Sequence, residues 1–219
     1  WNKYSGKVLT YGSEGQFDSQ WVSQPTVTKF NGLYYMGYAG YNGVRMEGGL
    51  ATANSLEGPW VKLPSNPVLR VNAQASQTLT SHVVSGDTFL KVNDSQVFHV
   101  GEPCYLQTPR ATEIVRIKSI PDNVTIELTE PVVLPYPEGA RIESIFAKSL
   151  GPNQMEYIDG KWRIWATTWA NIYGYETTAY AEGNDFYNLQ WIYDKSPLIY
   201  FEPLVRSYWD SISQENLRS

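Results

Sequence analysis

The sequence has little of what metal centres, disulfide scaffolds and nucleic-acid surfaces need. It contains one cysteine, Cys104, and two histidines, His82 and His99, which excludes a disulfide framework and a zinc site built from His and Cys ligands. Its 17 basic and 22 acidic residues give a net charge of −5, and the basic residues form no block. We therefore expect no metal, no cofactor and no nucleic-acid partner.

Long hydrophobic runs are also missing. No stretch approaches the roughly 18 consecutive apolar residues that a membrane-spanning helix needs, so we expect no membrane partner. No secretory signal is visible, and the chain of 219 residues begins with Trp1 rather than Met. We expect it to be an oligomer or part of a longer polypeptide.

Aromatic residues, in contrast, are abundant. The chain has eight tryptophans and sixteen tyrosines, with 42% hydrophobic and 18% charged residues overall. That composition can bury a core, so the chain is not a disordered segment. The surplus of aromatic rings favours a surface that binds sugar or peptide.

Three similar segments indicate an internal repeat. They begin at Trp1, Trp60 and Trp191, and each leads into a short apolar run. The first two tryptophans lie 59 residues apart and the second two 131, so the second interval is longer by 72 residues. This spacing predicts a repeat of 59 residues that is interrupted once by an inserted module.

The repeat has the strand pattern of a propeller blade. Asn31-Gly32 and Asp159-Gly160 are each flanked by alternating aromatic and β-branched residues, which predicts hairpins with two-residue type I′ turns. A third strand follows at residues 48–53 and 176–181, and the tryptophan-led segment supplies a fourth. We predict an all-β fold: a partial β-propeller of two four-stranded blades plus an outer strand at residues 1–9. The alternative is a β-sandwich with two chance hairpins.

Residues 74–145 have a different composition. They contain no tryptophan and only two tyrosines, Tyr105 and Tyr136, but they keep short strand-like runs separated by turn signals. We predict a small inserted β-barrel or sandwich, placed on a loop where insertions are tolerated. The predicted domains are therefore a discontinuous propeller (residues 1–73 and 146–202), the inserted module (74–145) and a C-terminal tail (203–219).

The blade motifs carry a resemblance to a known group of proteins. They are Gln24-Pro25, Asn31-Gly32-Leu33-Tyr34-Tyr35, Gly58-Pro59-Trp60 and Asn66-Pro67-Val68-Leu69. With these motifs, residues 1–72 and 146–200 resemble the five-bladed propeller glycoside hydrolases of families 43, 32 and 130. The resemblance implies the propeller fold and a polysaccharide or glycan as partner.

The inserted residues resemble a small β-rich module of phage tail and virion proteins. The matching positions are Gly86-Asp87, Gly101-Glu102, residues 113–117 and Pro137-Glu138-Gly139-Ala140. This resemblance implies an extracellular or virion-surface location, with other virion subunits as further partners.

Glycoside hydrolysis requires two carboxylates facing the scissile bond. In the enzymes that the chain resembles, one of them occupies the Asp-Pro position of an inner strand, where this chain has Gln24-Pro25. The matching stretch of the second blade carries Asn153 and Gln154. Amides hydrogen-bond to sugar hydroxyls but do not transfer protons, so we expect binding rather than hydrolysis.

Several acids remain near the predicted inner strands. Asp18 is the best surviving candidate for a displaced catalytic acid. The others are expected to be solvated turn or strand-edge carboxylates: Glu14, Glu47, Glu156, Asp159, Glu176 and Asp185.

Aromatic residues in loops and at strand ends are candidates for stacking on sugar rings. The predicted binding residues are Trp21, Gln24, Tyr41, Asn153, Gln154, Trp169, Asn171, Tyr173 and Tyr175, with residues 170–175 as a contact loop. Tyr35, Trp60, Trp162 or Trp165, and Trp191 follow the repeat and are expected to pack between strands.

These observations favour a carbohydrate-binding propeller of a phage tail or virion surface that recognises host polysaccharide without catalysis. Two alternatives stay open. One is a fragment of an active glycoside hydrolase that cleaves surface or plant-type polysaccharide, and the other is a structural virion component.

Overall fold

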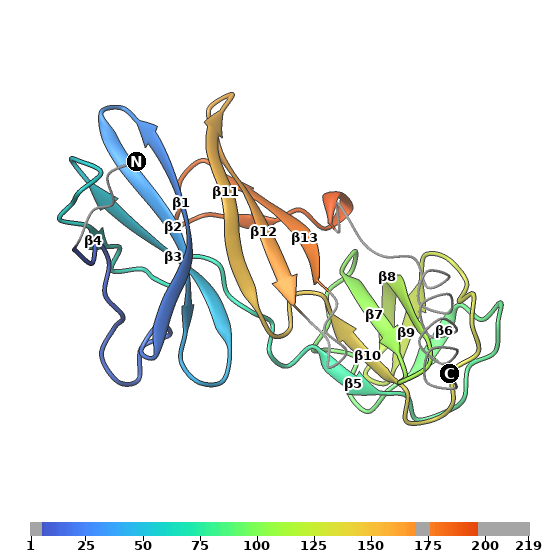
Figure 1. Cartoon of the computed structure of the whole chain (residues 1–219). Coiled ribbons are helices and arrows are strands. Elements are labelled where there is room, and N and C mark those ends of the chain that lie inside the picture. The colour runs from blue at the N-terminus through green and yellow to red at the C-terminus, as the bar shows by residue number, and fades with distance from the viewer. Residues whose placement is uncertain (1–5, 170–175, 197–219) are drawn as a thin grey trace, which may run out of the picture. The chain divides into compact units, whose positions relative to one another are not determined.

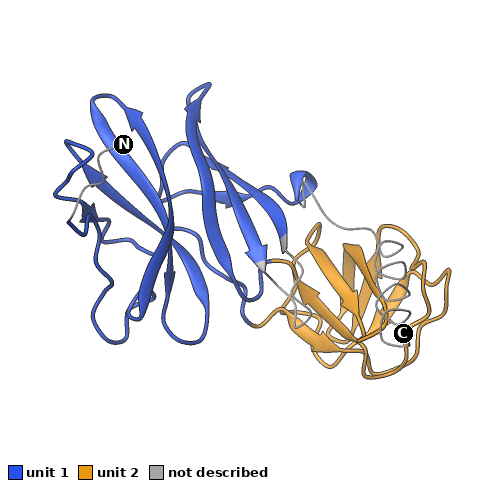
Figure 2. Ribbon diagram, viewed as in Figure 1, with its two compact units in different colours: residues 1–73, 146–169, 176–198 blue, residues 74–145, 170–175, 199–219 orange. Residues whose placement is uncertain are grey.

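The computed structural model describes residues 6–169 and 176–196, and the chain divides into two compact units (Figure 2). Among the described residues, unit 1 holds 6–73, 146–169 and 176–196, and unit 2 holds 74–145. No helix in this part of the chain is long and apolar enough to cross a membrane.

Unit 1 consists of two four-stranded antiparallel sheets, each with its strands in sequence order (Figure 1). The first sheet contains β1 (Trp21–Phe30), β2 (Leu33–Tyr41), β3 (Met46–Ala53) and β4 (Val61–Lys62). The second contains β11 (Leu150–Ile158), β12 (Lys161–Trp169), β13 (Glu176–Gly183) and β14 (Gln190–Trp191), followed by the 3₁₀ turn Tyr193–Lys195. This up-and-down order is that of a propeller blade, and it confirms the predicted all-β class with two blade-like sheets.

The first hairpin of each sheet closes with the predicted turn chemistry. Asn31 and Gly32 have φ angles of 48° and 82°, and Asp159 and Gly160 have 53° and 78°. A type I′ turn requires positive φ at both central residues, and Asn, Asp and Gly tolerate that region best. The two dipeptides therefore fix the register of β1 with β2 and of β11 with β12.

The predicted outer strand falls at the start of the chain, and the structure describes only part of it. Residues 1–5 lie outside the described residues, and residues 6–9 form no strand. Leu9 instead packs, with Phe17, against a buried cluster that includes Tyr38 and Trp60. Since β4 pairs with β3 over two residues only, it offers a short edge for a further strand to join.

The two sheets pack face to face through aromatic side chains. Trp162 of β12 is buried, and its ring lies 4.9 Å from Tyr35 and 4.2 Å from Phe186. The ring of Phe30, at the end of β1, lies 4.0 Å from the ring of Tyr157.

The predicted packing roles of Tyr35, Trp60, Trp162 and Trp191 are confirmed. Trp60 is buried, as Trp162 is, and the Trp191 ring lies 4.7 Å from the ring of Phe146.

Unit 2 is built from six strands. They are β5 (Ser76–Thr78), β6 (Phe89–Lys91), β7 (Pro103–Gln107), β8 (Thr112–Asp122), β9 (Thr125–Leu128) and β10 (Arg141–Ser144). Their order in the sheet is β5-β10-β7-β8-β9-β6, and a bridge between Leu79 and Val92 links its two outer strands. The sheet therefore closes on itself, as a small barrel requires.

Fully buried carboxylates hold the strands of unit 2 together. Glu102 accepts hydrogen bonds from the Ser144 hydroxyl at 2.5 Å and the His99 backbone N–H at 2.8 Å. Glu143 accepts one from the Gln107 amide at 3.3 Å. Each bond gives a buried polar atom a partner in place of water. This lowers the free-energy cost of burying the carboxylate.

Cys104 is expected to resist thiol reagents until unit 2 unfolds. Its side chain is fully buried in β7, and burial, together with the nearby Glu102 carboxylate, raises the pKa of its thiol well above the usual value. Reaction requires an accessible thiolate, so native protein should react with a chromogenic disulfide reagent over hours and urea-unfolded protein within minutes. Rapid reaction of the native protein would show that unit 2 opens readily.

Candidate functional site

β1 and β11 carry the predicted amides on β-bulges at corresponding places. The pairing of β1 with β2 shifts register between Ser23 and Thr26, and that of β11 with β12 shifts between Pro152 and Gln154. Gln24 adopts a φ of 50° in the first bulge, and Asn153 is the extra residue of the second. Since a bulge re-aims its side chains, both irregularities present amides to solvent.

Gln24, Asn153 and Gln154 are exposed and are called the edge amides below. β1 and β11 lie at the edges of their sheets and side by side in unit 1 (Figure 1). The Gln24 side chain reaches over β11, where a Cβ added to Gly151 would lie 2.1 Å from its Oε1 atom. The Gln24 amide therefore lies directly against the backbone of β11 at Gly151, where a larger residue would push the amide aside.

The other two edge amides bond to neighbours on their own sheet. Asn153 Nδ2 donates to Thr167 Oγ1 of β12, and Gln154 Nε2 donates to Glu156 Oε1 at 2.5 Å. These contacts orient each amide, and within residues 6–169 and 176–196 no hydrogen bond occupies its carbonyl oxygen, which can accept one.

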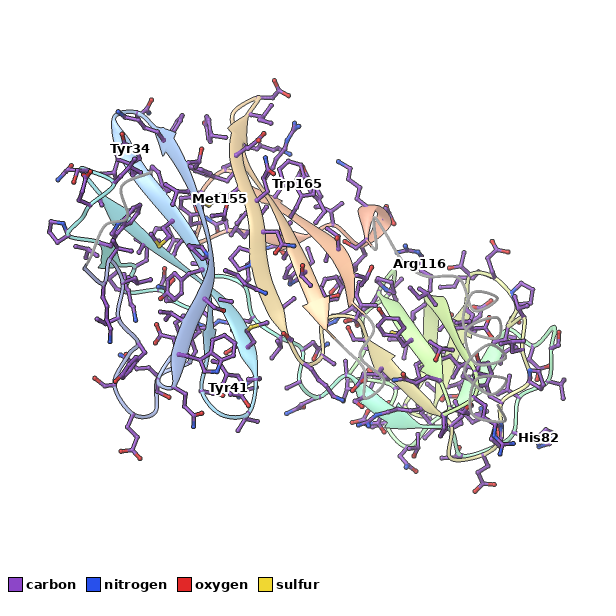
Figure 3. The ribbon with its side chains drawn as sticks, viewed as in Figure 1. Tyr34, Tyr41, His82, Arg116, Met155 and Trp165 are labelled. Carbon is purple, nitrogen blue, oxygen red and sulfur yellow. The ribbon has the colours of Figure 1, made fainter. Side chains whose placement is uncertain are left out.

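Trp21 and Tyr41 form an aromatic pair at one end of the first sheet. They face each other across β1 and β2, with ring centroids 5.0 Å apart and the Trp21 side chain 38% exposed. Figure 3 shows Tyr41 at the end of β2 opposite to Tyr34. Trp21 lies on the same strand as Gln24, so one accessible ring and one edge amide share β1.

The remaining predicted binding residues lie at the end of β12 and beyond it. Trp169 is the last residue of β12, where its backbone pairs with Glu176. Asn171, Tyr173 and Tyr175 lie outside the described residues, as does the predicted tail at residues 203–219. Their roles stay predictions.

Asp18, the candidate displaced acid, is buried and paired. Its side chain is 1% exposed, and its Oδ2 atom accepts hydrogen bonds from Lys62 Nζ at 2.5 Å and from the Tyr38 hydroxyl at 3.1 Å. Burial, with the Asp18 charge adding to it, raises the pKa of Tyr38 well above its usual value, so Tyr38 stays a donor. Asn66 Nδ2 donates to the Tyr38 oxygen in turn.

Of the acids expected to be solvated, Glu47 is buried and Glu156 is half-buried, and the Glu176 side chain lies outside the described part of the chain. Glu14 and Asp159 are exposed, and Asp185 accepts backbone hydrogen bonds from the turn that follows it. Glu47, in contrast, is 8% exposed, and its Oε1 atom accepts a hydrogen bond from the Val71 N–H at 3.2 Å. The prediction for Glu47 was wrong because the segment after β4 returns along β3, where Leu69 pairs with Gly48 and the Val71 N–H bonds to the carboxylate.

Both buried carboxylates line one cavity of unit 1, called the polar pocket below. Its volume is about 510 Å³, and the charged and aromatic residues that line it are Phe17, Asp18, Arg45, Glu47, Lys62 and Arg70. Sequence reasoning missed the three cations, because Lys62 and Asp18 are 44 residues apart and no motif links them. Within residues 6–169 and 176–196, no three His, Cys, Asp or Glu side chains gather closely enough to hold a metal ion.

Comparison with known proteins gives solved structures only. No protein-family model and no curated protein matches the chain. An α-L-arabinofuranosidase from Clostridium thermocellum is 17% identical, with 80% of this chain and 51% of that one covered at a TM-score of 0.23. An endo-arabinase from Bacteroides thetaiotaomicron is 15% identical, with 81% and 62% covered at 0.26. A thermostable family-43 glycoside hydrolase is 16% identical, with 83% and 56% covered at 0.25.

The chain thus spans less than two thirds of the length of these three proteins. Two of them are named as family-43 enzymes, one of the families that the blade motifs resemble. At these identities and TM-scores the similarity assigns no activity to the chain. The resemblance to families 32 and 130, and that of residues 74–145 to phage modules, stay predictions.

Proposed function

We propose that the chain is a carbohydrate-binding propeller segment that recognises polysaccharide through its edge amides and Trp21, without cleaving it. One observation carries the proposal: two bulges at corresponding places aim Gln24 and the Asn153-Gln154 pair into solvent along neighbouring edge strands. Amides donate to and accept from sugar hydroxyls, and none of the three can act as an acid or base at neutral pH.

Trp21 adds the apolar contact that sugar binding needs. Its ring is stacked against Tyr41 at a 31° interplanar angle, which holds it in place while 38% of the side chain stays accessible. A fixed ring offers its face to the apolar side of a pyranose, and nearby amides then select the hydroxyl arrangement.

We place this protein on a virion or another extracellular surface, with host polysaccharide as ligand and other virion subunits as neighbours. The support is the set of motifs in residues 74–145 that resemble phage tail modules. Fractionation of virions followed by immunodetection tests this location, and absence of the chain from purified particles would contradict it.

Binding should depend on the edge amides. The double substitution Gln24→Ala with Gln154→Ala removes hydrogen bonds worth about 0.5–1.5 kcal/mol each, so the Kd for a bound polysaccharide should rise about tenfold. Trp21→Ala should weaken binding by a similar factor. The measurement is a glycan-array screen of the whole chain, followed by calorimetric titration of the best ligand.

Gln190→Ala is the matched control, because Gln190 is exposed on β14, the last strand of the second sheet. Its Kd should equal that of the parent chain. Equal weakening by the control, or none by the double substitution, would show that the edge amides are not the binding surface.

A second function has one observation in its favour: Asp18 and Glu47 both line the polar pocket, and hydrolysis needs two carboxylates. Against it, Asp18 already pairs with Lys62 and Glu47 accepts a backbone N–H. Release of reducing sugar from a bound polysaccharide, abolished by Asp18→Asn in a variant that still folds, would replace the binding proposal with this one.

A further inference from the structure

We propose that the polar pocket binds the carboxylate of an acidic sugar unit, a hexuronate, as a second subsite apart from the edge amides. This rests on the proposed function for the sugar and on the charges of the pocket for the acid. The pocket lies within unit 1 and is lined by the turn between β2 and β3, by β4 and by the segments that precede β1 and follow β4.

The charges of the pocket leave two cations without a partner. The ammonium of Lys62 is paired with Asp18, and the Glu47 carboxylate accepts the Val71 N–H. Arg45 and Arg70 are exposed and form no ion pair with any residue in the described ranges. The lining has three cations and two carboxylates, so its formal charge is +1. In a chain of net charge −5, this positive cavity with two exposed guanidinium groups favours an anionic ligand.

The backbone around both arginines is fixed. The side-chain oxygen of Asn42 accepts the N–H groups of Val44 at 3.0 Å and Arg45 at 3.1 Å, which closes the turn between β2 and β3. Arg70 follows Leu69, which is buried and donates its N–H to the Gly48 carbonyl at 3.1 Å. A pocket whose cations start from fixed backbone loses less entropy when it binds.

The chemistry of the lining fits a sugar acid better than a small inorganic anion. A guanidinium group binds a carboxylate through two parallel hydrogen bonds. The half-buried ring of Phe17 gives the pocket an apolar surface for the sugar face, and Asn42 Nδ2 is available to a hydroxyl because its oxygen closes the turn. The cavity of about 510 Å³ lies in the range of roughly 300–1,000 Å³ that small-ligand sites occupy.

The test titrates the whole chain with glucuronate, glucose and inorganic sulfate, following NMR shifts or heat. Glucuronate should bind, and the double substitution Arg45→Gln with Arg70→Gln should raise its Kd at least tenfold. Glucose should bind more weakly, and its Kd should be the same for the parent chain and the double variant. Both side chains are exposed, so circular dichroism should show an unchanged fold.

The control is the double substitution Lys7→Gln with Arg110→Gln, which removes the same charge at exposed positions that do not line the pocket. It should leave the glucuronate Kd unchanged. The proposal is overturned if the parent chain does not bind glucuronate, if both double variants weaken it alike, or if sulfate binds as tightly as glucuronate. Loss of polysaccharide binding in the Gln24 and Gln154 variant, with glucuronate binding intact, separates the two subsites.

Discussion

Replacing Trp162 with alanine is expected to lower the free energy of unfolding of unit 1 by about 3–5 kcal/mol. The residue is 4% exposed and makes ring contacts with Tyr35 of the first sheet and Tyr157 of the second. Its removal leaves a cavity where the sheets meet, because strands held by ladder hydrogen bonds cannot collapse into the space. Urea unfolding followed by circular dichroism gives the change.

Trp165→Ala is the matched control, since Trp165 lies on the same strand, is only half-buried and has Tyr180 as its nearest ring at 5.5 Å. We expect it to cost about 1–2 kcal/mol. The thiol of Cys104 reports separately on unit 2 and should show the same unfolding midpoint in both variants. Equal losses for the two tryptophans would show that contact between the sheets is not what stabilises unit 1.

The blade-like sheets were predictable because their information is local. Asn31-Gly32 and Asp159-Gly160 set the turns, and the aromatic and β-branched residues on either side favour extended strands. A turn and its flanking strands span a dozen or so residues, so a short pattern contains the whole motif. The described residues 6–9 of the predicted outer strand form no strand, because a repeat predicts a similar segment but not whether its partner edge is long enough to pair.

The site was only partly predictable for the opposite reason. The sequence identified Gln24, Asn153 and Gln154 by their positions in the blade motifs, but it carried no sign of the bulges that expose them. The polar pocket depends on contacts between residues far apart, such as Lys62 with Asp18. An acidic residue with no recognisable motif around it is predicted to lie at the surface, and for this reason the sequence did not predict the burial of Glu47.

Asp18→Ala is expected to destabilise unit 1 by about 2–3 kcal/mol. The substitution leaves Lys62 beside the pocket without its counter-ion and the buried Tyr38 hydroxyl without its acceptor. Lys62 retains 26% exposure, so water recovers part of the loss, and the effect stays below that of a fully buried pair. Urea unfolding followed by tryptophan fluorescence measures it, because no tryptophan lies in residues 74–145.

Combining Asp18→Ala with Lys62→Met in one variant tests whether Asp18 has a structural or a catalytic role. If the carboxylate serves to neutralise Lys62, the pair of substitutions should cost less than the sum of the two single ones by about 1–2 kcal/mol, because each single change leaves the other charge unpaired. Additive costs would mean that the ion pair contributes nothing. If Asp18→Ala leaves the stability unchanged or increases it, the carboxylate of the parent chain does not serve stability. That result would favour a catalytic role, since an active-site acid is often kept at the expense of stability. The cycle thus separates a structural ion pair from a displaced catalytic acid without needing the substrate in hand.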